Sequence, residues 1–166
     1  MVNLTLDVGK RVLNSKNHSA GHLIDLAIKN LNLSWIPGKG FHYPEGCYVQ
    51  YQAKDEISTD LESLKIQIQQ EFDALVKQNL QVQIEFDQTQ VFNGETLRTV
   101  SFAGLCPCPC GGTHVENTAD LDGFEITKIK VKSDVIKISY GMSASFDIDK
   151  QAELRRENLL SKIMKK

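Results

Sequence analysis

The sequence predicts an α+β fold in which helices pack on an antiparallel sheet. Two segments repeat apolar residues at helical spacing, several short segments alternate apolar and polar residues, and two alternating segments flank a tight turn. The order helix, loop, strand, helix, strands, loop, hairpin, helix indicates a two-layer sandwich. With 166 residues, 41% hydrophobic and 24% charged, the chain is expected to form one globular domain and not a disordered or membrane protein.

The first predicted helix spans residues 17 to about 34. Its apolar residues recur on one helical face: Leu23, Leu26, Ala27 and Leu31. Three residues are candidate N-caps: Asn14, Ser15 and Asn17. Residues 36–46, IPGKGFHYPEG, are predicted to form turns because they contain two prolines and three glycines. Residues 47–52 then form a short strand.

The second predicted helix begins at Thr59 and runs to about Leu80. Thr59 and Glu62 have the spacing of a capping box, and an apolar face follows from Leu61 to Val76. This pattern is the most regular helical signal in the sequence.

Alternation of apolar and polar residues predicts two further strands, at residues 81–86 and 96–102. The same pattern predicts a hairpin over residues 124–142 that turns at Ser133-Asp134. The last sixteen residues, 151–166, favour a basic helix or tail. The sequence is therefore divided into a domain of residues 1–150 and this tail.

Four residues form two short motifs with metal-ligand spacing. His18 and His22 are four residues apart, so both imidazoles project from one face of the first helix. Cys110 and His114 flank two glycines that allow a tight loop. Each motif alone is more often structural, but three of the four histidines fall in these two motifs. A thiolate with imidazoles suits Zn²⁺ better than magnesium or calcium, so we predict a zinc site.

The other cysteines indicate a reducing compartment. Three of the four cysteines are crowded into residues 106–110, where disulfide geometry is hard to reach. The N-terminal residues do not have the pattern of a targeting segment. The predicted location is therefore cytoplasmic. Cys106 and Cys108 are interpreted as bystanders in a tight loop, with a second metal or a redox switch as alternatives. His42 and Cys47 are interpreted as partly buried or core residues.

Two stretches resemble a known family. HSAGHLI at 18–24 and CGGTHVENTADLDGFEITKIK at 110–130 resemble the editing domain of alanyl-tRNA synthetases and its freestanding AlaX-type relatives. The second additional domain of threonyl-tRNA synthetases has a similar pattern. The resemblance spans residues 18 to about 141 and implies the sandwich common to these synthetases, in a short form without the extra N-terminal β-barrel.

The resemblance implies a zinc-dependent trans-editing hydrolase that deacylates mischarged tRNA at its acceptor end. The expected substrate is seryl-tRNA for alanine, followed by glycyl-tRNA for alanine. His18, His22, Cys110 and His114 would be the metal ligands. Thr113 would contact the ester or a water, or else satisfy the turn. The expected substrate-binding residues are Gly21, Gly38, Lys39 and Gly40.

Two departures from the family bear on specificity. Gly21 stands where alanyl editing domains commonly have a threonine, and the segment from Gly38 to Gly46 lacks the usual Gln and Gly-Ser pair. Both positions are expected near the amino-acid pocket. The pocket can therefore differ in shape from that of the family.

Charge is segregated along the chain. The formal net charge of -2 combines about -7 over residues 1–127 with about +5 over residues 128–166. The tRNA-contact candidates are Lys128, Lys130, Lys132, Lys137, Arg155 and Arg156. The alternative for this surface is an ordinary solvated strand face.

The main competing function is a non-catalytic zinc-stabilised module that binds tRNA or RNA. A zinc hydrolase acting on another ester or amide is a third interpretation. A metalloprotease is disfavoured because Ser19 stands where its His-Glu-x-x-His motif has the general base. No membrane partner is expected, since no apolar run approaches the length of a membrane span.

Overall fold

The α+β prediction is confirmed by a computed structural model, which describes residues 7–54, 60–92 and 94–143. The two α-helices in this part of the chain are α1 (Val8–Asn30) and α2 (Leu61–Lys77). A four-stranded antiparallel sheet has the order β1 (Trp35–Phe41), β2 (Tyr48–Ala53), β7 (Val135–Met142) and β6 (Phe124–Lys132). A short 3-10 helix, η1 (Thr118–Leu121), precedes β6.

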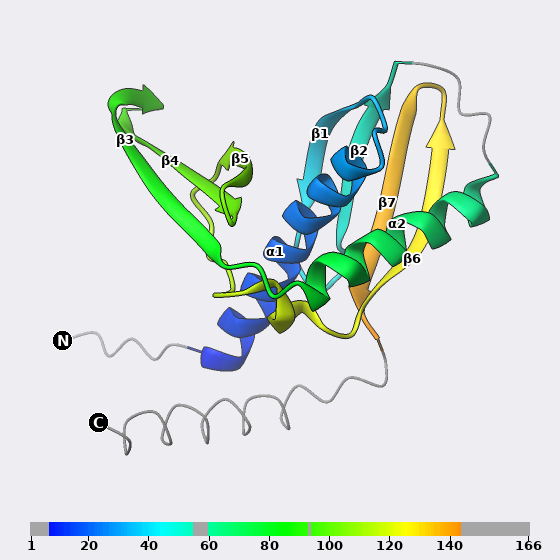
Figure 1. Ribbon diagram of the computed structural model, residues 1–166, viewed down its shortest axis with the longest axis horizontal. Helices are drawn as coiled ribbons and strands as arrows, with labels where there is room; N and C mark the ends of the chain where they lie inside the picture. The colour runs from blue at the N-terminus through cyan, green and yellow to red at the C-terminus, as the bar shows by residue number, and fades with distance from the viewer. Residues whose placement is uncertain (1–6, 55–59, 93, 144–166) are drawn as a thin grey trace.

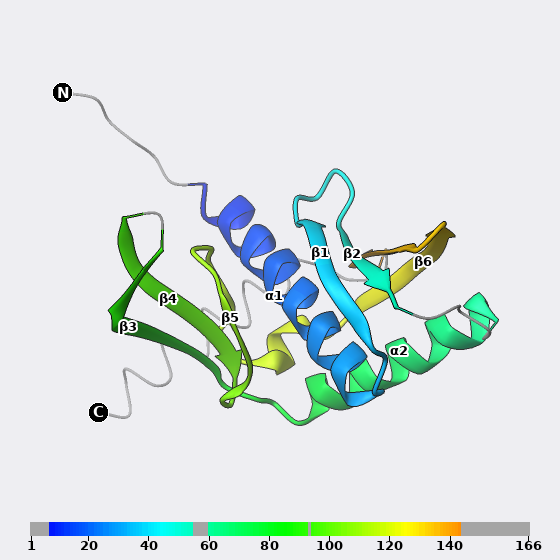
Figure 2. The ribbon, with the colours of Figure 1, turned by 90° about the horizontal axis from the view of Figure 1, so that it is seen from above.

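A second sheet forms a unit of its own. It contains three antiparallel strands in the order β3 (Val82–Phe92), β4 (Glu95–Phe102) and β5 (Leu105–Pro109). Figure 1 and Figure 2 show this small sheet beside α1, on the side away from the four-stranded sheet. The predicted strands 81–86 and 96–102 belong to it, whereas the sequence patterns indicated a single sheet.

Both helices pack on one face of the four-stranded sheet (Figure 1). The side chains that this face and the helices bury between them include Leu23, Ile24, Ile68, Phe72, Val49, Tyr51, Ile136 and Ile138. Alternate residues of β2 and β7 point to the opposite, outer face, because successive side chains in a strand alternate. Among the described residues, helices therefore cover one face of this sheet.

Helix α1 begins nine residues earlier than predicted. Its N-cap is Asp7, whose Oδ1 accepts a hydrogen bond from the Lys10 N–H at 2.9 Å. The predicted caps, residues 14–17, lie inside the helix. The apolar pattern missed the first turns because they are exposed and contribute little to the core.

Helix α2 begins at Leu61, close to the predicted start. Its N-cap is Asp60, whose carboxylate accepts from the Ser63 N–H at 2.9 Å. The cap is therefore not the predicted Thr59, which lies outside the described residues. The helix ends at Lys77, before the predicted Leu80, and Asn79 follows in the left-handed region with φ of 51°.

Two predicted loops contain strands. β1 occupies part of the predicted turn segment 36–46, with a register shift between Pro37 and Gly40. β5 occupies part of the cysteine-rich loop. Both lie at the edge of their sheet, where a proline can be tolerated because one side of the strand has no ladder to complete.

The predicted hairpin is present as β6 and β7, which turn at Ser133-Asp134. A register shift between Ile126 and Lys128 marks a bulge in β6. The predicted tail 151–166, with Arg155 and Arg156, lies outside the described residues. No helix among the described residues is both long and apolar enough to span a membrane.

Candidate metal centre

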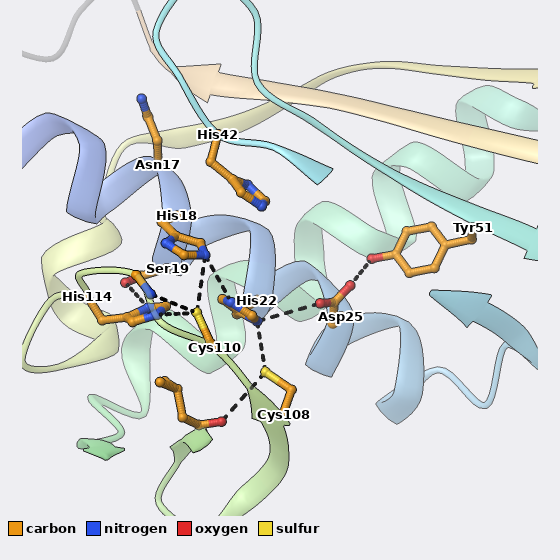
Figure 3. A network of polar contacts seen from close by, with 12 residues as sticks. Asn17, His18, Ser19, His22, Asp25, His42, Tyr51, Cys108, Cys110 and His114 are labelled. Atoms are coloured by element: carbon orange, nitrogen blue, oxygen red, sulfur yellow. Dashed lines mark hydrogen bonds and ion pairs between the residues drawn. The ribbon is translucent and has the colours of Figure 1, made fainter. Parts of the chain in front are cut away.

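The structure brings the four predicted ligands together. His18 and His22 project from one face of α1 toward the loop that follows β5, where Cys110 and His114 lie (Figure 3). The two helical Nε2 atoms are 3.3 Å apart. Cys110 Sγ lies 3.4 Å from His18 Nε2 and 3.3 Å from His114 Nε2. One ligand atom from each residue lies within 4.8 Å of all the others.

These spacings fit zinc. Zinc binds imidazole nitrogen at about 2.0–2.1 Å and thiolate sulfur at about 2.3 Å, so ligand atoms at tetrahedral angles are roughly 3.3–3.6 Å apart. The three distances above are close to this range. Three nitrogens and one sulfur are also a donor set that zinc prefers.

The imidazoles are in the form that a metal requires. Burial, and then the neighbouring His18, lower the pKa of both His22 and His114 to about 3. Burial and the positive charge of Arg98 also lower the pKa of His18. All three rings are therefore neutral at pH 7, with lone pairs free for coordination.

Ser19 orients His114. Its hydroxyl lies 3.0 Å from His114 Nδ1 and accepts the Val115 N–H at 3.1 Å. The side chain is fully buried between α1 and the ligand loop. The tautomer that donates from Nδ1 to Ser19 has its lone pair on Nε2, which faces Cys110 and is the atom a metal would take.

His22 has partners that the sequence interpretation missed. Its Nδ1 lies 3.1 Å from Cys108 Sγ and 3.8 Å from Asp25 Oδ2. Asp25 Oδ1 accepts a 2.5 Å hydrogen bond from the Tyr51 hydroxyl on β2. Burial raises the pKa of Asp25 to about 6, although the Tyr51 hydrogen bond lowers it, and burial raises the pKa of Cys108 to about 12.

Cys108 is therefore a protonated thiol beside the centre and not an isolated bystander. Its sulfur is in hydrogen-bonding contact with His22 Nδ1, while the Asp25 carboxylate lies farther from that atom. The available sequence signal was Asp25, an acidic residue one helical turn after His22 on a largely buried helix face.

His42 also belongs to this centre. Its ring stacks on that of His18, with centroids 4.7 Å apart, and its Nδ1 lies 2.6 Å from the Tyr140 hydroxyl. Burial, and then His18, lower the pKa of His42 to about 4. The sequence interpretation treated His42 as an ordinary half-buried residue.

Two glycines make room for His42. A Cβ on Gly21 would lie 2.5 Å from His42 Cε1, and one on Gly40 would lie 2.6 Å from His42 Nε2. Gly21, the departure from the family's threonine, is thus matched by the imidazole that fills the space beside it. A Cβ on Gly38 would instead lie 3.2 Å from the Gln50 carbonyl oxygen of β2. Lys39 is exposed on β1.

The ligand loop is tied to its surroundings on two sides. Arg98 of β4 donates to the Cys110 carbonyl, and the Cys110 N–H donates back to the Arg98 carbonyl at 3.0 Å. The Ser15 hydroxyl of α1 lies 2.9 Å from the Thr113 hydroxyl, within hydrogen-bonding distance. Thr113 therefore links the loop to α1.

The lysine candidates lie elsewhere, on the outer face of the four-stranded sheet. Cross-strand pairing sets Lys128 opposite Ser139, Lys130 opposite Lys137 and Lys132 opposite Val135, while Ile129 on β6 points inward. The helices and the metal ligands are on the other side of this sheet.

The sequence is similar to one domain family and to several alanine–tRNA ligases. The family described as the threonyl and alanyl tRNA synthetase second additional domain matches residues 97–137, which include two of the four ligands. The chain is 26% identical to the alanine–tRNA ligase of Mycoplasmopsis synoviae, over 90% of this chain and 18% of that protein. It is 27% identical to that of Mycoplasma capricolum, over 80% and 16%, and 26% identical to that of Nitrosopumilus maritimus, over 92% and 19%.

Residues 97–137 are similar to the domain that threonyl and alanyl tRNA synthetases share. The chain is related to the editing domain of the alanyl-tRNA synthetases, as residues 18–24 and 110–130 predicted. It spans less than a fifth of the length of these relatives.

Proposed function

We propose that this protein is a zinc-dependent hydrolase that removes a wrongly attached amino acid from the 3′ end of tRNA in trans. The proposed substrate is alanine tRNA that carries serine, and the second is alanine tRNA that carries glycine. The observation that carries this proposal is the convergence of His18, His22, Cys110 and His114 at distances suited to one zinc ion. The relationship to alanine–tRNA ligases supports tRNA as the partner.

The reaction adds a water oxygen to the ester carbonyl carbon, breaks the bond from that carbon to the ribose oxygen, and leaves a proton on the ribose. Bound zinc would supply a Lewis acid that polarises the carbonyl or lowers the pKa of a water to about 7. Thr113 Oγ1 lies 2.9 Å from Ser15 Oγ, which holds the Thr113 hydroxyl at the ligand loop, where it could contact the ester or a water. Ser19 and the Asp25–Cys108 pair hold the imidazoles in one orientation.

The proposed amino-acid pocket lies beside the His18 ring. Gly21 contributes no side chain there, and His42 occupies the space instead. A small residue such as serine or glycine suits this restricted space. Gly38, Lys39 and Gly40 follow along β1, and the exposed Lys39 ammonium suits a phosphate of the terminal nucleotides.

A non-catalytic module is the alternative, and one observation favours it. Four protein ligands complete a tetrahedral zinc site, as they do in structural sites, whereas hydrolytic zinc sites keep one position for water or substrate. In this alternative, zinc would only join α1 to the ligand loop while the protein binds tRNA.

Measuring zinc content and then amino-acid release separates the two. The zinc-loaded protein is expected to release serine from alanine tRNA charged with serine. Alanine tRNA charged with glycine or alanine, and threonine tRNA charged with serine, are assayed alongside. His18→Ala and Cys110→Ala should lose zinc and release together, whereas Cys47→Ala, a buried cysteine outside the cluster, should keep both. The absence of release from every substrate, with tRNA affinity retained, would establish the binding module instead.

A further inference from the structure

The outer face of the four-stranded sheet combines aromatic and basic side chains. Both described helices pack on the opposite face, so these side chains point away from the core. Cross-strand pairing sets Phe41 beside Tyr48, Tyr48 beside Ser139, and Ser139 beside Lys128. With strands about 4.8 Å apart, this row crosses the sheet in roughly 14 Å.

Aromatic rings occupy the β1–β2 end of this face. Phe41 stacks on Tyr48 with centroids 6.0 Å apart and an interplanar angle of 14°. Tyr43 meets Phe41 edge-on at 5.3 Å. Phe41 and Tyr43 remain 37% and 54% exposed, which is unusual for large rings that have nearby partners to pack against.

Lysines occupy the rest of the face. Lys137 Nζ lies 3.7 Å from the Tyr48 ring centroid, a cation–π contact that joins the aromatic and basic regions. The lysines on this face are Lys128, Lys130, Lys132 and Lys137. Glu125 and Asp134 lie at its ends, so these six residues have a net charge of +2, counted as four positive and two negative.

The aromatic end is adjacent to the metal centre. Phe41, His42 and Tyr43 are consecutive, and His42 turns inward to stack on His18 while Phe41 and Tyr43 contact each other on the outer side. His42 therefore connects the aromatic rings of the outer face to the candidate ligand His18.

From this arrangement we infer that the outer face, from Phe41, Tyr43 and Tyr48 to the four lysines, binds single-stranded RNA. The occupant is the unpaired 3′ end of the tRNA substrate, so the inference rests on the proposed function. Bases stack on the rings and phosphates contact the lysines, which is the combination that sheet surfaces use to bind unpaired nucleic acid. The excess positive charge complements the phosphate backbone.

The first test compares two RNA hairpins of acceptor-stem length, with and without a short single-stranded 3′ overhang. Fluorescence anisotropy should show that the protein binds the hairpin with the overhang more tightly than the blunt hairpin. Phe41→Ala and Tyr48→Ala should each weaken binding of the overhang hairpin by about 5- to 160-fold, the range for loss of one base–aromatic stack, and leave binding of the blunt hairpin unchanged. Phe86→Ala is the matched control, because Phe86 is an exposed phenylalanine on the other sheet.

The second test uses salt dependence. Lys130→Gln should reduce the slope of log affinity against log salt by about 0.7 for the overhang, as expected for one single-strand phosphate contact. Lys77→Gln, at the end of α2, should leave the slope unchanged. Equal slopes in both variants, or equal affinity of Phe41→Ala and Phe86→Ala for the overhang, would overturn the inference.

Two further outcomes are distinguishable. If the protein deacylates tRNA and the Phe41 and Tyr48 variants do so at unchanged KM, the proposed function stands and the RNA surface is wrong. If overhang binding depends on Phe41 and Tyr48 but no amino acid is released, the surface stands and the hydrolase is wrong. If the unsubstituted protein has the mass of a dimer and Phe41→Ala has the mass of a monomer, this face joins two copies of the chain, and the inference is overturned.

Discussion

Replacement of Gly112 by alanine tests the metal centre without removing a ligand. A Cβ at Gly112 would lie closer than 3.0 Å to both Cε1 and Nδ1 of His18. A Cβ at Gly111, the preceding residue, would have no neighbour within 4 Å. The two glycines therefore form a matched pair, one against the ligand ring and one in open space.

The size of the effect follows from the overlap. Carbon contacts settle at about 3.5–4.0 Å, so His18 or the ligand loop must move by at least about 0.5 Å. Zinc sites hold their ligand distances within about 0.2 Å, and loss of an orienting contact alone costs about 10- to 100-fold in affinity. We expect Gly112→Ala to weaken zinc binding by at least this factor, and Gly111→Ala to leave it unchanged.

Competition with a chromophoric chelator measures both affinities, and circular dichroism checks that both variants are folded. Overpacking by the added methyl is expected to cost about 1–3 kcal/mol of the free energy of unfolding in Gly112→Ala. Equal zinc affinity in the two variants would refute the placement of His18 against the loop, and with it the geometry of the centre.

Three further predictions concern stability, each measured by urea unfolding. Tyr51→Phe leaves the buried Asp25 carboxylate without its phenol donor and should lower the free energy of unfolding by about 1–3 kcal/mol; an unchanged value would mean that this hydrogen bond is not formed. Thr118→Val removes a buried hydroxyl that joins one backbone N–H and one carbonyl, and should cost about 1–3 kcal/mol for each group; a stable variant would contradict that placement. Asp7→Ala removes the cap of α1 and should cost about 0.5–2 kcal/mol, whereas no change would indicate that the helix starts later, as the sequence pattern suggested.

Local spacing made several features predictable. The apolar face of α2 and the alternation of β6 and β7 depend on residues close in sequence, and each was found near its predicted position. The four candidate ligands stood out for the same reason, since each pair lies within one helical turn or one short loop. That α1 and the ligand loop meet in space was inferred from chemistry and not from any local pattern.

Edge strands were the main failure of local reasoning. Pro37 and two glycines made the β1 segment look like a turn, and the alternation of Cys and Pro hid β5 in a predicted loop. A proline disrupts a central strand but not a free edge, and edge position depends on which strands pair across the whole chain. The separate three-stranded sheet follows from the same long-range pairing.

The surroundings of the centre were unpredictable for a related reason. His42 reaches His18 only because the β1–β2 connection folds over α1, and Cys108 reaches His22 only because β5 is a strand. These contacts join residues separated by long stretches of sequence. Gly21 was noticed as a departure from the family, but its reason, the imidazole of His42, is visible only in three dimensions.

The ligand arrangement also has a topological consequence. His18 and Cys110 are separated by 92 residues along the chain, and the stretch between them contains the whole three-stranded sheet and two strands of the four-stranded sheet. A zinc ion bound to both would act as a removable cross-link; closing a loop of about this length restricts the unfolded chain by roughly 4–5 kcal/mol in the entropic model. Chelation would then release β5 from α1, and faster amide exchange in the three-stranded sheet than in the four-stranded sheet would report that release.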